Sequence, residues 1–407
     1  MGIVVQKYGG SSVSDPGKIR KVAERVMRTT KEGHSVCVVV SAMGDTTDEL
    51  LSLAKKVTPN PERRELDMLL SAGERIAMAL LSMAIRELGG DAISFTGSQS
   101  GIITNDVHSN ARIIEVRPYR VQDELARGKI VVIAGYQGVS YKKEVTTLGR
   151  GGSDTTAVAM AAALGAEWCE ICSDVDGVYT TDPRVVKAAT RIGTLSYEET
   201  QEMAEAGAKV LNAQAVEFAK EKDIAIYARA TAGPLPGKDP ASDGTVVRKS
   251  PPRMPGTVVG VASEKDVLVL ECEGRSAALL AFLDERAVSG KQLHIAGFGD
   301  TERLTMVVSR ENLHDEDRFR KLLAEKFEGK ARLVDGLGAV SAIGAGINAS
   351  YQNVRKGTEA LAAAGIKAGG VATSSFRITW MIPRESVDEA VRRLHAVFLE
   401  AAGPLVP

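Results

Sequence analysis

The sequence predicts an α/β protein in which a mostly parallel sheet, sandwiched by helices, is followed by two smaller ferredoxin-like βαββαβ units. Strand-like and helix-like patterns alternate from Gly2 to about Ala230, which is typical of a parallel sheet covered on both faces. A segment rich in proline and glycine comes next. Beyond it the order strand, helix, strand occurs twice, with a repeat of about 70 residues that indicates the two smaller units.

The first strand leads into a loop that suits a phosphate group. Residues 3–6 run into Lys7-Tyr8-Gly9-Gly10-Ser11-Ser12, and a helix with a regular apolar face is predicted over 16–30. Glycine lets backbone N–H groups face a ligand without a Cβ in the way, and Lys7 adds a positive charge. The loop is not a Walker A motif, since G-x-x-x-x-G-K-[ST] does not occur in the sequence.

Two more apolar strands end in loops of the same kind. The strand predicted over 36–40 runs into the loop 41–48, and the strand over 170–172 runs into the loop 173–184. Between them we predict a long apolar helix over 74–88 and a strand over 130–134. In an open α/β sheet, loops that leave the carboxyl ends of strands gather where ligands bind. These loops are therefore expected to form one site.

The segment LGRGGSDTTA at 148–157 carries the strongest local signal. It combines glycines, a cation, hydroxyls and a carboxylate just ahead of an Ala-rich helix predicted over 155–164. A helix start adds roughly half a positive charge and attracts anions. Arg150 can bind a carboxylate or phosphate through two hydrogen bonds, whereas Asp154 would hold or orient another group. The alternative is that Ser153 or Asp154 merely caps the helix.

Six blocks of sequence resemble those of the aspartokinases in order and spacing. They are KYGGSS at 7–12, VVVSAMGDTTD at 38–48, SAGE at 71–74, TLGRGGSDTTA at 147–157, SDVDGVYTTDPR at 173–184 and GAKVL at 207–211. The resemblance is close over the first 230 or so residues and implies the amino-acid kinase fold. The remaining third is similar, with more departures, to the paired ACT regulatory domains of that family.

This resemblance implies an ATP-dependent kinase that converts L-aspartate to 4-phospho-L-aspartate, the entry step to lysine, threonine and methionine synthesis. Another kinase of the same fold, acting on glutamate, carbamate or a nucleoside monophosphate, is one alternative, and a non-catalytic amino-acid sensor is another. The cofactor implied is ATP with Mg²⁺ carried on its phosphates, with no metal site in the protein. The N–H groups of Gly9, Gly10, Gly151 and Gly152 would help Lys7 to neutralise phosphate charge.

The resemblance also implies roles for individual residues. The catalytic set is Lys7, Gly10, Gly151, Gly152 and Asp154. The substrate-binding set is Ser41, Thr47, Glu74, Arg150 and Ser153. The ATP-binding set is Lys7, Gly9, Gly10, Ser11, Ser173, Asp174, Tyr179, Asp182, Arg184 and Lys209. After GAKVL the family often continues His-Pro-Arg, whereas this chain has Asn212, Ala213 and Gln214, so these three positions carry no predicted role.

Three of these residues have competing structural interpretations. Lys7 can be a solvated surface lysine. Ser71 to Glu74 fits a capping box, in which the Glu74 side chain would bond back to a helix start. Thr47, or the neighbouring Asp48, can be a plain helix cap.

The predicted domains are residues 1–232, a linker at 233–256 and a regulatory region at 257–407. By resemblance the ACT-like units lie at about 264–332 and 333–407, and a strand over 257–262 joins the second. Such units imply at least a homodimer and an amino-acid effector site. The loops at 273–277 and 348–353 lack the Pro-Gly turn that receives an effector carboxylate in the family. Feedback control is therefore expected to be absent, weak or keyed to another ligand, with Arg275 as one carboxylate-binding candidate.

The composition argues against some classes of binding partner and against a membrane location. A net charge of −1 over 407 residues argues against nucleic acid or an anionic membrane. No run approaches about 18 apolar residues, so no membrane span is predicted. The first strand begins within three residues of the start, which leaves no room for a signal peptide and predicts a cytoplasmic protein.

The four cysteines predict buried core residues. Cys169 and Cys172 form a C-x-x-C, which is also the spacing of redox and zinc motifs. Both lie in a predicted strand, where side chains three positions apart point to opposite faces. The two thiols are therefore expected to diverge.

Overall fold

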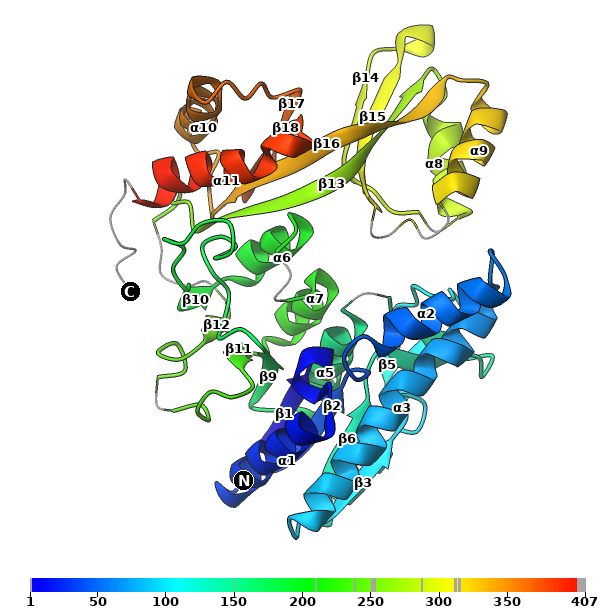
Figure 1. Cartoon of the computed structure of the whole chain (residues 1–407), viewed down its shortest axis with the longest axis vertical. Coiled ribbons are helices and arrows are strands. Elements are labelled where there is room, and N and C mark those ends of the chain that lie inside the picture. Colours follow the sequence, from blue (N-terminus) through cyan, green and yellow to red (C-terminus); the bar gives the residue numbers. More distant parts are fainter. Residues whose placement is uncertain are drawn as a thin grey trace.

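The computed structural model describes residues 2–149, 151–208, 211–237, 239–249, 254–286, 288–310, 313 and 316–400. Its first region is built on an eight-stranded sheet with the order β10-β12-β11-β9-β1-β2-β6-β3 (Figure 1). The strands are β1 (Ile3–Tyr8), β2 (Ser35–Val40), β3 (Ala92–Phe95), β6 (Ile130–Ala134), β9 (Trp168–Ser173), β10 (Thr194–Leu195), β11 (Ile226–Ala230) and β12 (Thr245–Val247). All neighbouring pairs are parallel except β11 with β12. The predicted mostly parallel sheet is thus confirmed.

Helices cover both faces of this sheet. They are α1 (Pro16–Lys31), α2 (Thr46–Val57), α3 (Arg63–Glu87), α4 (Tyr119–Ala126), α5 (Gly152–Leu164), α6 (Tyr197–Glu205) and α7 (Ala213–Lys222). Alternate residues of β2 show the two faces: Val36, Val38 and Val40 pack with α1 and α3, whereas Cys37 and Val39 pack in the cluster that contains α5 and α7. A small four-stranded sheet comprises β4 (Ile102–Thr104), β5 (Ile113–Val116), β7 (Gln137–Ser140) and β8 (Val145–Thr147).

The cysteines lie as predicted. Cys169 belongs to the core cluster around α5, and Cys172 belongs to the cluster around α1 and α3, so the two thiols occupy opposite faces of β9. All four cysteines are buried and free. Burial alone raises the pKa of the Cys37 thiol to about 12, which keeps it protonated and unreactive at neutral pH.

The long helix α3 differs from its prediction in two ways. It begins at Arg63 rather than near Glu74. In the described part of the chain it is also the one helix long and apolar enough to cross a membrane by length and composition, although the sequence predicted no such segment. Half of its most apolar stretch is buried, and it packs against α1, β3 and β6. We therefore interpret α3 as a core helix.

The second region is one antiparallel sheet with the order β14-β15-β13-β16-β18-β17. Its strands are β13 (Gly260–Glu273), β14 (Lys291–Ala296), β15 (Arg303–Ser309), β16 (Ala331–Ile343), β17 (Gly370–Thr373) and β18 (Arg377–Pro383), and its helices are α8 (Ser276–Asp284), α9 (Glu316–Phe327), α10 (Gln352–Ala363) and α11 (Val387–His395). The two central strands β13 and β16 are long and run through both units (Figure 1). Each unit has its own core, one under α8 and α9 and one under α10 and α11.

The chain order within this region is the predicted βαββαβ. The first unit runs β13, α8, β14, β15, α9, β16. The second runs β16, α10, β17, β18, α11 and is completed by the first half of β13, where Gly260 to Glu264 pair with β16. A register shift between Glu264 and Val267 separates the two halves of β13. The predicted linker at 233–256 contains β12, so part of it belongs to the eight-stranded sheet.

Candidate active site

A buried ion pair joins the first strand to the glycine-rich helix start. The Lys7 Nζ lies 2.6 Å from Asp154 Oδ1, and the two side chains are only 11% and 10% exposed. Lys7 is near the end of β1, and Asp154 is in the first turn of α5, so the parallel sheet brings them together as predicted. Lys7 is therefore not a solvated surface lysine. The N-cap of α5 is Gly151, with φ 72° and no side-chain cap, so the interpretation of Ser153 or Asp154 as the cap is wrong.

Two glycines of these loops, Gly10 and Gly151, are required by close packing within the protein. A Cβ on Gly10 would lie 2.9 Å from the carbonyl oxygen of Ala42, and one on Gly151 would lie 2.3 Å from Asn212 Nδ2. The Gly44 N–H donates to the Gly10 carbonyl at 3.0 Å, which joins loop 7–12 to loop 41–48. No larger residue fits at Gly10 or Gly151 without moving a neighbouring loop.

Two N–H groups that were expected to face phosphate are bonded to carbonyl groups instead. The Gly9 N–H donates to Cys172 at 3.3 Å, and the Gly152 N–H donates to Gly149 at 3.0 Å. The expectation that these two groups donate directly to a ligand is therefore not met in this structure. A loop that must turn away from the sheet satisfies its own backbone first, because an unpaired buried N–H is costly.

Glu74 points from the interior of α3 toward loop 41–48. Its Oε1 accepts a hydrogen bond from the Ala42 N–H at 3.2 Å, while Oε2 is buried with no partner among the residues that the structure describes. Burial raises the pKa of this carboxyl to about 7. The capping-box interpretation is wrong, because Glu74 lies well inside α3 and the Ser71 hydroxyl donates to the Met68 carbonyl.

The other predicted substrate-binding residues are Ser41, Thr47, Arg150 and Ser153. The Ser41 N–H donates to Tyr8 at 3.1 Å, which fixes the start of loop 41–48 beside the end of β1. The N-cap of α2 is Asp45, so neither Thr47 nor Asp48 is the cap. Ser153 is buried in the first turn of α5, and Arg150 lies outside the described residues.

The loop 173–184 has exposed residues, and several of its side chains contact one another. The Tyr179 hydroxyl donates to Asp176 at 2.8 Å, which raises the pKa of Tyr179. Arg184 is largely exposed and pairs with Asp182 at 2.7 Å, which lowers the pKa of that carboxyl. Asp174 is exposed. Lys209 lies outside the described residues.

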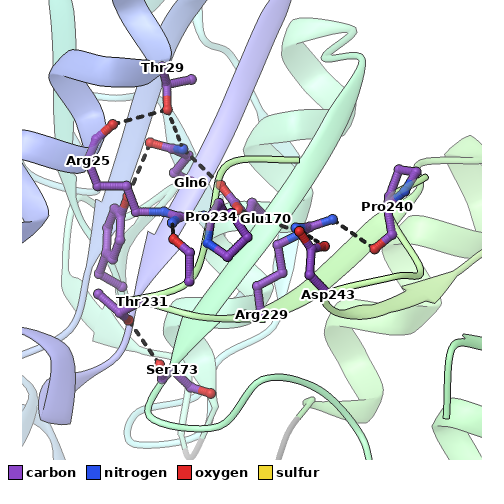
Figure 2. A network of polar contacts seen from close by, with 12 residues as sticks. Gln6, Arg25, Thr29, Glu170, Ser173, Arg229, Thr231, Pro234, Pro240 and Asp243 are labelled. Atoms are coloured by element: carbon purple, nitrogen blue, oxygen red, sulfur yellow. Dashed lines mark hydrogen bonds and ion pairs between the residues drawn. The ribbon is translucent and has the colours of Figure 1, made fainter. Parts of the chain in front are cut away.

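Thr231 joins this loop to the first one. Its N–H donates to the Ser173 carbonyl at 2.8 Å, and its hydroxyl lies 2.6 Å from the Ser12 hydroxyl (Figure 2 shows the contact with Ser173). Ser11 is exposed, and its carbonyl accepts from Lys18. Asn212 caps α7 by accepting from the N–H groups of Gln214 and Ala215, so the departure from His-Pro-Arg has a local structural role here.

A buried charge network beneath the site was not predicted. Glu170 on β9 is fully buried and pairs with Arg25 of α1 at 2.5 Å, while the Gln6 amide donates to its other oxygen at 2.8 Å (Figure 2). Arg229 of β11 lies on the other side and pairs with Asp243 at 2.6 Å. The sequence signal for this network was limited to single charged residues within apolar strands, because the residues that pair in the network are far apart in sequence.

This network also fixes the segment that follows β11. Arg25 donates to the carbonyl groups of Gly233 and Pro234, and Arg229 donates to that of Pro240. The proline-rich segment is therefore tied to the sheet through buried guanidinium groups. Among the described residues, no group of three or more His, Cys, Asp or Glu is placed to hold a metal ion.

Comparisons with known proteins agree with the predicted amino-acid kinase fold. The model of the amino acid kinase family matches residues 2–228. The aspartokinase of Mycolicibacterium smegmatis is 46% identical over 414 residues, which cover 98% of this chain and 96% of that protein. The aspartokinase of Corynebacterium glutamicum is 42% identical over 412 residues, with 98% and 96% covered.

Solved structures give the same result for the fold. The E. coli aspartokinase III complex with aspartate and ADP, in the R-state, superposes with a TM-score of 0.82 at 24% identity and covers 97% of this chain and 99% of that chain. Aspartate kinase from Synechocystis is 34% identical with a TM-score of 0.54, and the match covers 99% of this chain and 70% of that one. The predicted combination of fold classes is confirmed.

Proposed function

The chain belongs to the amino acid kinase family and, within it, to the aspartokinases, and from this premise we propose how its residues transfer a phosphoryl group from ATP to the side chain of L-aspartate. The product is 4-phospho-L-aspartate, which feeds lysine, threonine and methionine synthesis. The observation that carries the proposal is the pairing of two features: the buried Lys7–Asp154 ion pair and the buried Glu74 oxygen that has no partner among the described residues.

The nucleophile needs no general base. The side-chain carboxylate of aspartate has an unperturbed pKa of about 3.9, so it is ionised at neutral pH. One of its oxygens attacks the γ-phosphorus, the bond from that phosphorus to the β–γ bridging oxygen breaks, and ADP leaves with the electron pair. The protein therefore acts by positioning the two substrates and by stabilising charge.

Lys7 supplies the charge that follows the moving phosphoryl group. Asp154, at 2.6 Å, holds the ammonium group in place at the start of α5, where the helix dipole also favours an anion. Asp154 is a positioning residue and not a base. Gly10 lets its loop approach Ala42 and Gly44, Gly151 lets the start of α5 approach Asn212, and Gly152 packs against Leu148 and Tyr136.

Glu74 binds the α-ammonium group of aspartate. A buried carboxylate with one unpaired oxygen is an unfavourable arrangement unless a cation neutralises it. An ammonium group at Oε2 would do so and would lower the raised pKa of Glu74. We assign Arg150 to a substrate carboxylate, and Ser41, Thr47 and Ser153 to the wall around the substrate.

Loop 173–184 binds the nucleotide. Ser173, Asp174, Tyr179, Asp182, Arg184 and Lys209 form this side, together with Gly9 and Ser11 of the first loop. Mg²⁺ would enter on the ATP phosphates and neutralise part of their charge, since the described residues offer no cluster that would hold it by themselves.

We also propose the assembly and location of the protein. The catalytic domain is residues 1–232, and the regulatory region from 257 holds ACT-like units at about 264–332 and 333–407. A homodimer forms through the strands of these units, and the protein is cytoplasmic. Light scattering at micromolar concentration should report at least a dimer, and a monomer would contradict this part of the proposal.

One assay tests the central proposal. The protein is incubated with ATP, Mg²⁺ and an acid, and hydroxylamine traps the acyl phosphate. Turnover is expected with L-aspartate and essentially none with L-glutamate. Equal rates with both acids would point to another kinase of this fold, and no turnover with aspartate would favour a non-catalytic sensor.

A further inference from the structure

Thr180, in the middle of loop 173–184, lies in the contact between the two regions of the molecule. It is only 2% exposed, and its carbonyl accepts a hydrogen bond at 2.7 Å from the N–H of Val261 on β13. Its hydroxyl oxygen lies 3.0 Å from Nε2 of His395 at the end of α11. Backbone and side chain of one residue are thus both held by the regulatory region.

His395 is oriented for this contact from its other side. It is also 2% exposed, and its Nδ1 lies 2.9 Å from Glu400 Oε1. A carboxylate can only accept, so Nδ1 carries the proton, and in the neutral ring Nε2 accepts from the Thr180 hydroxyl. The Thr180 oxygen in turn accepts from the Thr190 N–H at 3.0 Å. The result is a hydrogen-bonded chain that begins at the half-exposed Glu400 and is buried at His395 and Thr180.

The packing beside this chain ties the same loop to the regulatory core. Val186, just after the loop, is buried in the cluster formed by α10, α11 and the central strands. Val178 and Thr181, close to Thr180 in sequence, are also buried, and the Val178 N–H donates to the Thr245 hydroxyl at 2.8 Å. By contrast, Asp174 and Arg184 are exposed, so the loop opens to solvent toward its two ends. Tyr179 and Asp182 flank Thr180 and Thr181 in sequence.

We propose that His395 is a positioning residue for nucleotide binding: through Thr180 it fixes the loop that carries Tyr179 and Asp182. This inference rests on the proposed assignment of loop 173–184 to ATP. The end of α11 then acts on the nucleotide side of the site and leaves Lys7 and Glu74 unaffected. Loss of the contact weakens ATP binding without changing the chemistry.

The test uses the full-length protein and separates KM from kcat. His395→Ala should raise the KM for ATP about fivefold to thirtyfold, the range for one buried hydrogen bond, while kcat and the aspartate KM change less than about threefold. His395→Gln, whose amide reaches the position of Nε2, should restore most of the ATP affinity. His395→Asn, which reaches only the position of Nδ1, should behave like alanine.

The matched control is Arg393→Ala on the same helix, because among the described residues Arg393 pairs with the nearby Glu389 alone, and it is half exposed. It should leave all three parameters unchanged. If His395→Ala cannot be purified, Thr180→Val against Thr180→Ser makes the same comparison at the other end of the bond. An ATP KM within twofold of the parent in the alanine variant, or the same rise in Arg393→Ala, would overturn the inference.

Calorimetry with Mg·ADP separates this inference from the proposed function. Binding to the parent protein, with weaker binding by the same factor in His395→Ala, supports the inference even when no turnover is measured. Equal binding by both proteins rejects the role of His395 alone. No binding by the parent protein rejects the nucleotide assignment and the inference with it.

Discussion

The two sheets of the molecule are built differently. In the first region, parallel strands covered on both faces end at one edge, so short loops from distant parts of the chain meet there. In the second region, the antiparallel strands β13 and β16 run through both units, and the structure depends on pairings along the strands. The site of the parallel sheet can therefore be recognised from local sequence blocks, whereas the antiparallel sheet has few local sequence motifs.

The regions also differ in where they place charge. The first buries Glu170 with Arg25 and Arg229 under the site, all at most 1% exposed. The second has more exposed ion pairs, such as Lys265 with Asp388 at 57% and 41% exposed, and its Lys291–Glu264 pair is still 19% and 16% exposed. Buried partners are expensive to separate, while exposed pairs contribute little.

Neutralising the buried network should give the largest effect. Glu170→Gln keeps the shape but leaves Arg25 without its carboxylate, which should lower the free energy of unfolding by about 3–5 kcal/mol. Urea denaturation measures this. Asp388→Asn in the regulatory region should cost less than about 1 kcal/mol. Similar losses in the two variants would remove the contrast between the regions.

Removing the Lys7 charge should give the next effect, and on rate rather than stability. Lys7→Ala should lower kcat by about 10² to 10³, with a modest change in either KM, because one charge-stabilising donor is lost in the transition state. Steady-state kinetics with both substrates varied measures this. Lys18→Ala removes a lysine that contacts Ser11 from outside the site and should change kcat less than about twofold. A kcat within tenfold of the parent in Lys7→Ala would mean that another group carries the charge.

Glu74→Gln should chiefly raise the aspartate KM. The variant weakens an ammonium contact that exists in the ground state and in the transition state alike, so about a tenfold to hundredfold rise is expected with little change in kcat. Thermal stability should not fall, since an amide replaces a buried carboxyl. Glu87→Gln near the exposed end of the same helix is the control. An unchanged KM would exclude Glu74 from the substrate site.

The same carboxyl predicts a pH dependence. Its pKa in the free protein is raised to about 7, so below pH 7 a proton must leave before an ammonium group can bind. The aspartate KM should rise as pH falls from 7.5 to 5.5, approaching tenfold per pH unit, and this slope should vanish in Glu74→Gln. The effect on folding stability has the opposite sign. Because the protonated form of Glu74 favours the folded state, its contribution to the free energy of unfolding is present below about pH 4.5 and is lost as pH rises through 7. A flat KM profile in the parent protein would contradict the assignment.

The sequence predicted the parallel sheet and its loops because strand, glycine turn and helix start lie next to one another in the chain. It did not predict β14 and β17, which are edge strands with exposed residues and no clear alternation. It misplaced the start of α3, because four of the five residues 63–67 are charged and hide the first turn of the helix. Asp67 is buried there and binds His108 and Thr147, partners that only the folded chain brings near.

The roles of the site residues were predictable only in part for the same reason. The pairing of Lys7 with Asp154 was predictable, because each residue lies in a glycine-rich loop expected at the same edge of the parallel sheet. The contact of Glu74 with Ala42, the Glu170 network and the Thr180–His395 contact each join residues far apart in sequence, and no local pattern encodes such pairs. The packing roles of Gly10 and Gly151 likewise depend on backbone atoms of other loops.

Amino acids added as effectors of the regulatory loops should change the activity least of all. In the first unit, the start of α8 is already satisfied from within, because the Ser276 N–H donates to the carboxylate of Glu302 at 3.2 Å. In the second unit, the Asn353 Nδ2 group already donates to the carbonyl groups of Gly256 and Ile347. A helix start that already has an internal anion is a poor receptor for an effector carboxylate.

We therefore expect lysine, threonine and methionine, singly and together at millimolar concentration, to change the rate less than about twofold. Glu302→Gln weakens the internal contact and should increase any inhibition, while Glu328→Gln, after α9, should not. Strong inhibition of the parent protein by lysine or threonine alone below 1 mM would show that these loops bind an effector without the Pro-Gly turn.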